Sequence, residues 1–88
     1  MKLNGTFVVR EIAGDMIIVP VGETALHFNG MITINKTGAA LWEVLEKGGE
    51  KEDLVRVLTD RFEVTEEEAK TDVEEFLEQL KAQNFLAE

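Results

Sequence analysis

The first third of the chain has the apolar pattern of β-strands. Two runs rich in β-branched residues, 7–12 and 16–21, flank Ala13-Gly14-Asp15. Because glycine supplies the positive φ that a short hairpin turn requires, the pattern predicts a β-hairpin. Pro20 has no N–H to donate to a ladder, so we expect the end of the second strand to lie at an edge or where pairing stops.

A second hairpin is predicted after the break at Gly22-Glu23-Thr24. Residues 25–28 and 31–34 flank Asn29-Gly30, and Asn-Gly is the strongest short hairpin signal. The first arm has a weak strand pattern and is expected to be partly irregular. The second arm, 31–34, is the predicted third strand.

From Asn35 onward the apolar spacing changes from two residues to three and four, which is typical of helices. Asn35 is a suitable N-cap for a first helix that Gly48-Gly49 ends. A second helix is expected over about 50–62, with Glu50 where a hydroxyl cap is more usual. Thr65 and Glu68 form a capping box for a third helix that ends near Ala82. The tail 84–86 is predicted to pack back on the core.

These elements predict an α+β fold in which a small antiparallel three-stranded sheet precedes three helices. The second and third helices are joined by Glu63-Val64-Thr65, which suggests a winged helix-turn-helix arrangement. The 88 residues can bury one small core but not two. We therefore expect a single domain over residues 1–88, with Trp42 in its core.

The composition excludes most catalytic chemistry. The chain has no Cys, no Ser and no Tyr, and its one His is His27. Nucleophilic catalysis needs a nucleophile with a nearby base, and metal sites need several ligands of suitable spacing, so His27 is expected to be a surface residue. The glycines form no phosphate-binding motif. The sequence predicts no enzyme activity, no cofactor and no metal.

The charge is strongly acidic and unevenly distributed. Of 18 acidic and 9 basic residues, the first 44 positions hold four and three, and the other 44 hold fourteen and six, for a net charge of −9. Nucleic-acid binding depends on clustered Lys and Arg, so we expect no nucleic-acid partner. No apolar run approaches the ~18 residues of a membrane span, so no membrane partner and a cytoplasmic location are expected.

The strand-to-helix junction from Ile34 to Trp42, together with Gly48-Gly49, Phe62, the apolar spacing around Val73 and the Phe85-Leu86 tail, resembles the PqqD family. The resemblance covers residues 7–86. It implies a three-stranded sheet with three helices, and a chaperone that presents a ribosomally made precursor peptide to a radical SAM enzyme. Related domains are called RiPP precursor peptide recognition elements.

The resemblance further implies that the leader of the precursor binds by strand addition at the third strand, in a groove walled by the third helix. An edge strand can satisfy the backbone groups of a guest strand without any catalytic residue, and the acidic third helix suits a leader that carries Lys or Arg. The partners expected are thus a leader peptide and a radical SAM or other peptide-modifying enzyme. The candidate peptide-binding residues are Met31, Ile32, Thr33, Ile34, Val73, Glu74, Phe76, Leu77, Glu78 and Leu80.

Two alternatives are consistent with the same elements. A winged-helix DNA-binding regulator would share the fold, but its recognition helix should carry Arg, Lys, Asn or Gln on the outer face. The predicted third helix carries mostly Glu there. A structural subunit of an enzyme complex would bind the enzyme without binding a peptide.

Overall fold

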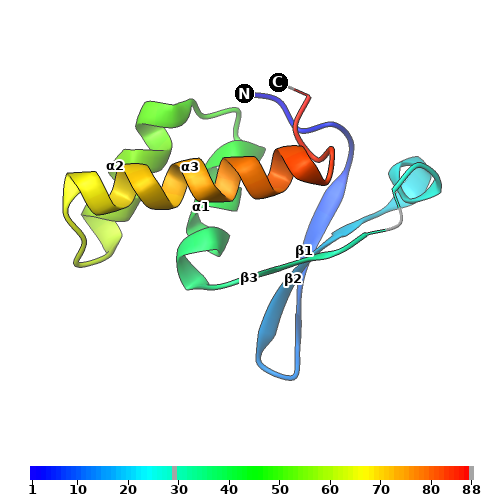
Figure 1. Ribbon diagram of the computed structural model, residues 1–88. Helices are drawn as coiled ribbons and strands as arrows, with labels where there is room; N and C mark the ends of the chain where they lie inside the picture. Colours follow the sequence, from blue (N-terminus) through cyan, green and yellow to red (C-terminus); the bar gives the residue numbers. More distant parts are fainter. Residues whose placement is uncertain (29, 88) are drawn as a thin grey trace.

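The computed structural model describes residues 1–28 and 30–87 and confirms an α+β fold. Strands β1 (Phe7–Ile12), β2 (Asp15–Pro20) and β3 (Ile32–Ile34) form an antiparallel sheet in that order. Helices α1 (Lys36–Glu46), α2 (Lys51–Arg61) and α3 (Glu66–Ala82) follow. Figure 1 shows the hairpin of β1 and β2 extending away from the helices, and the chain ends lying close together.

The first hairpin is tighter than predicted. Asp15 belongs to β2, so only Ala13 and Gly14 remain in the loop, both at positive φ of 52° and 88°. Positive φ at both central residues is the requirement of a type I′ turn, which matches the twist of the flanking strands. Pro20 pairs with Phe7 on β1, but β3 pairs with β2 only at residues 16–18. The end of β2 therefore lies where its pairing with β3 has stopped, as predicted.

The prediction of a strand over residues 25–28 is wrong. Gly22–Leu26 forms a short 3-10 helix, η1, and the predicted turn residue Asn29 lies outside the described residues. Two contacts account for the difference. The Thr24 hydroxyl accepts a hydrogen bond from the N–H of Thr6 at 2.8 Å, and the Thr24 carbonyl accepts one from the N–H of His27 at 3.0 Å. One bond within the segment and one from the distant Thr6 thus hold it in place without a ladder.

The predicted helix ends agree with the structure. The Asn35 carboxamide oxygen accepts from the N–H of Gly38 at 2.9 Å, which caps α1. In α3 the Thr65 hydroxyl accepts from the N–H of Glu68, and the Glu68 carboxylate accepts from the N–H of Thr65. The pKa of the Glu68 carboxyl lies below its usual range. The larger cause is the hydrogen bond from the Thr65 backbone N–H, and the smaller is the interaction with the Thr65 side chain.

The last turn of α3 is closed by a Schellman motif. Asn84 has φ of 63°, its N–H donates to the carbonyl of Lys81, and the N–H of Phe85 donates to the carbonyl of Leu80 at 2.8 Å. The turn directs Phe85 into the core, where it is fully buried against Phe7 and Phe28. A bridge between Leu3 and Leu86 then fixes the tail, which confirms the prediction that it packs back.

The core lies between one face of the sheet and the helices. Ile18 and Ile32 are cross-strand neighbours and both are buried, whereas Thr33 in the next register position is exposed. Trp42 is fully buried, as predicted. The alternation along β3 follows from the two-residue period of a strand with one covered face.

Candidate functional site

The third strand is an open edge of the sheet. Among the residues that the structure describes, β3 pairs with β2 on one side and with no strand on the other. An unpaired strand leaves backbone N–H and C=O groups available to an added strand. Met31, just before β3, is 65% exposed.

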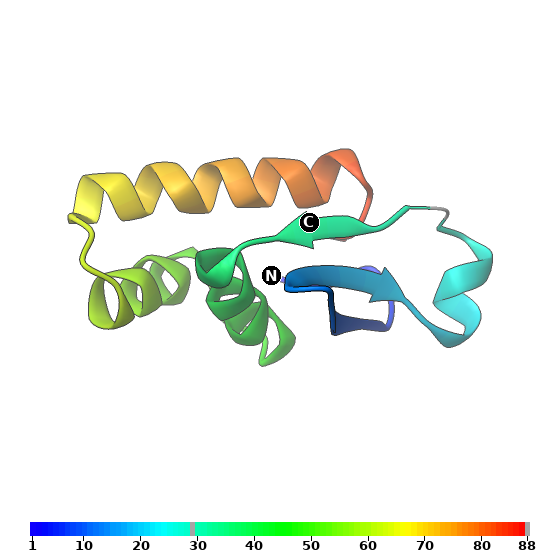
Figure 2. The same cartoon turned by 90° about the horizontal axis from the view of Figure 1, so that it is seen from below.

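Helix α3 runs beside this edge in the opposite direction (Figure 2). Before the start of the strand, a Cβ built on Gly30 would lie 2.9 Å from Oε1 of Gln83, the residue that directly follows α3. At the far end, Ile34 and Phe76 both lie close to Gly38 in α1. The edge of β3 is therefore flanked by α3 along its length.

A pocket of about 180 Å³ opens where β3 passes into α1. Its floor is formed by Gly38, Leu41 and Phe76, which are all buried. A Cβ at position 38 would lie 3.0 Å from Cβ of Ile34 and 3.4 Å from Cε1 of Phe76. Glycine thus permits the close approach of α1 to β3 that shapes this pocket. Polar residues surround the floor: Asn35, Thr37, Asp72, Glu75 and Gln79.

The rim of the pocket is acidic. Asp72 and Glu75 are exposed and have no ion-pair partner among residues 1–28 and 30–87. On the opposite flank of α3, by contrast, the Glu74 carboxylate pairs with Nζ of Lys51 at 3.3 Å. The negative charge that faces β3 is thus less compensated than the charge that faces α2.

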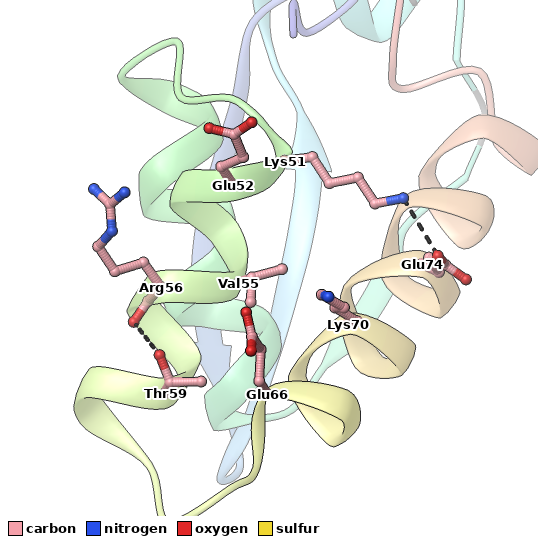
Figure 3. Close-up of a pocket in the computed structure, with 8 residues that line it drawn as sticks. All are labelled: Lys51, Glu52, Val55, Arg56, Thr59, Glu66, Lys70 and Glu74. Carbon is pink, nitrogen blue, oxygen red and sulfur yellow. Dashed lines mark hydrogen bonds and ion pairs between the residues drawn. The ribbon is translucent and has the colours of Figure 1, made fainter.

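A larger hollow of about 750 Å³ lies between α2 and α3 (Figure 3). Val55 is the one apolar residue in its described lining, and the ion pair of Lys51 with Glu74 crosses it. The remaining lining mixes both signs of charge: Glu52, Arg56, Thr59, Glu66 and Lys70. Such a mixed surface lies away from the open strand and offers no backbone groups for pairing.

The predicted site residues fall into three groups. Ile32, Ile34 and four α3 residues are buried in the core, whereas Met31 and Thr33 are exposed beside the open edge. Glu74 faces α2, and Glu78 is exposed but lines neither of these two hollows. The four buried α3 residues are Val73, Phe76, Leu77 and Leu80, and only Phe76 also reaches the pocket.

The sequence interpretation did not include the polar residues of α3 that face β3. Asp72, Glu75 and Gln79 line the pocket, and Gln83 lies near Gly30. Their spacing of three and four places them on one flank of the helix, beside the apolar stripe. That spacing was present in the sequence, but which flank faces β3 depends on how the helix packs.

Comparison with protein-family models gives a match over residues 16–86 to PqqD, described as coenzyme PQQ synthesis protein D. The chain belongs to the PqqD family. The matched span includes β2 from Met16 onward, β3 and the three helices, whereas β1 precedes it. The resemblance inferred from the strand-to-helix junction is thereby confirmed. A comparison with curated proteins gave no match.

Two solved structures share the fold of this PqqD family member. One is described as TbiB1 in complex with the TbiA(beta) leader peptide, with a TM-score of 0.75 and 20% identity, covering 99% of this chain and 95% of that one. The other is lasso peptide synthetase B1 complexed with the leader peptide, with a TM-score of 0.70 and 21% identity over 97% and 93%. At these identities the likeness establishes the fold.

Within the described residues, no helix has the length and apolar character needed to cross a bilayer. The same residues contain no group of three or more His, Asp or Glu side chains placed to hold a metal ion. His27 is exposed at the end of η1. The site at β3 and α3 therefore offers backbone groups, an apolar floor and carboxylates as its chemistry.

Proposed function

We propose that this PqqD family protein is a non-catalytic chaperone that captures the leader of a ribosomally made precursor peptide by adding it as a strand to β3. The observation that carries the proposal is the open edge of β3 beside α3, with a pocket at its end. Strand addition takes affinity from backbone hydrogen bonds and selectivity from side-chain pockets. Both similar structures are described as complexes with leader peptides, which supports the same use of this fold.

Membership of the PqqD family supports a peptide-modifying enzyme as the partner. A leader bound at β3 leaves the rest of the precursor free to reach a separate enzyme, and we assign that enzyme to the peptide-modifying class, with a radical SAM enzyme as the first candidate. A short precursor gene and a radical SAM gene beside the gene for this chain would support the assignment. The exposed residues of α3 include Glu67, Glu75 and Glu78, and their negative charge does not support major-groove recognition of DNA.

Strand addition is tested by removing backbone donors from the guest. A peptide selected from a random library on the immobilised protein is resynthesised with one N-methyl amide at a time. Because alternate residues of a strand direct their N–H groups to opposite sides, methylation should weaken binding at every second position only. Each lost bond is expected to cost about 1 kcal/mol or more, which is about a fivefold or larger change in Kd. Uniform effects, or none, would contradict strand addition.

The acidic charge of α3 predicts salt-dependent association. For a leader carrying Lys or Arg, the association rate should fall as salt rises from about 50 mM to about 500 mM, because the screening length shrinks from roughly 14 Å to roughly 4 Å. Dissociation should change less, since backbone bonds and apolar contacts hold the bound state. Stopped-flow rates measure both, with a Lys→Gln peptide as control. An association rate that does not respond to salt would restrict the role of the charge to solubility.

A further inference from the structure

We infer that the pocket where β3 meets α1 is a subsite that selects a Lys or Arg side chain of the guest peptide. This inference rests on the proposed function, because the subsite is useful only to a peptide lying along β3. The pocket adjoins the downstream end of the open edge, so the selected side chain belongs to one end of the guest strand. We name this pocket the basic-residue subsite, formed by Gly38, Leu41, Asp72, Glu75 and Phe76.

The floor of the basic-residue subsite suits an aliphatic stem. Leu41 and Phe76 are nearly fully buried, and Gly38 adds no side chain above them. Lys and Arg pack their methylene stems on apolar surface while keeping the charged group in water. The apolar floor is small and polar residues surround it, so a side chain with an apolar stem and a polar head matches both parts of the pocket.

The rim supplies the charge that complements the head group. Asp72 and Glu75 are free of ion pairs among the described residues, whereas the carboxamide oxygen of Asn35 already accepts from Thr37 and Gly38. An ammonium or guanidinium group over Phe76 would find two carboxylates as acceptors. An acidic guest side chain would meet two like charges, and a purely aliphatic one would leave both carboxylates without a partner.

The subsite also fixes a register. Side chains of an added strand alternate between the groove and the outer face of the sheet. The basic residue must therefore stand an even number of positions from every other guest residue that faces the groove. A random sequence that binds β3 in the same register is expected to place Lys or Arg at a single position.

The test is a display selection of random peptides of about twelve residues on three immobilised proteins: the unaltered chain, D72N/E75Q and E66Q/E67Q. Both double variants remove two exposed carboxylates from α3, but only the first removes them from the subsite. We expect Lys or Arg at one fixed position on the unaltered chain and on E66Q/E67Q, and no such preference on D72N/E75Q. Thermal unfolding establishes that the three proteins are folded alike.

A selected peptide then gives the affinity. Changing its fixed Lys to Met should weaken binding to the unaltered chain about fivefold, as for a partly exposed ion pair, and leave binding to D72N/E75Q unchanged. Peptides that bind through alternate backbone amides but show the same basic preference on all three proteins, or none, would overturn the subsite while leaving strand addition in place. Peptides whose binding does not depend on alternate amides would overturn the proposed function itself.

Discussion

Phe85→Ala is expected to destabilise the protein by about 3–5 kcal/mol, the usual cost of truncating a buried phenylalanine. The ring is fully buried, with its centroid 4.4 Å from that of Phe7 and 5.5 Å from that of Phe28. Its loss would leave a cavity where β1, the tail and the segment before β3 meet. A domain of this length has a total stability of only roughly 4–13 kcal/mol, so the thermal midpoint should fall by more than about 10 °C.

Leu26→Ala is the matched control, because Leu26 is 80% exposed. Truncation at an exposed position is expected to change stability by no more than about 0.5 kcal/mol. Urea unfolding measures both variants. A loss below about 1 kcal/mol for Phe85→Ala would show that the tail does not complete the core.

The sequence predicted the fold well where one local signal determined the backbone. The side chains of Asn35 and Thr65 accept hydrogen bonds from the first turn of their own helix. A segment of four residues is therefore sufficient to predict each cap. The presence of a turn between the first two strands is also signalled locally by Gly14, although the loop is one residue shorter than predicted. These features need no information about distant parts of the chain.

The sequence failed where a distant contact decided the outcome. Residues 25 and 26 belong to η1 because Thr24 bonds to Thr6, eighteen positions earlier, and no local pattern indicates that bond. The ends of α3 were predicted, but the flank of the helix that faces β3 was not. The sequence predicts Glu74 as a peptide-binding residue of the groove beside β3. In the structure its carboxylate pairs with Lys51 of α2.

The candidate site divides in the same way. The apolar pattern predicts the third strand, and the resemblance to the PqqD family implies its use as the edge for strand addition. The pocket beside it requires Gly38, Ile34 and Phe76 to come together from three elements. Only packing reveals that combination. The same packing leaves Phe76 as the one buried residue of α3 that reaches the pocket. The polar residues beside the buried stripe therefore form the rim.

The strongest test on the protein side is Thr33→Pro, which should weaken peptide binding at least about fivefold. Thr33 is the central residue of β3, and its side chain is exposed. Proline removes the N–H that we expect to face the open edge, and it leaves a guest carbonyl without a donor. An unsatisfied carbonyl together with the lost bond costs about 1–3 kcal/mol.

Thr33→Val separates the backbone from the side chain, because valine keeps the N–H and also favours strands. Its affinity should equal that of the unaltered protein, whereas the affinity of Thr33→Pro should fall. Fluorescence polarisation with one selected peptide gives both values, and thermal unfolding shows whether the pairing of β2 with β3 survives the proline. A folded Thr33→Pro variant with unchanged Kd would exclude strand addition at β3, since that strand would then contribute no donor at its centre.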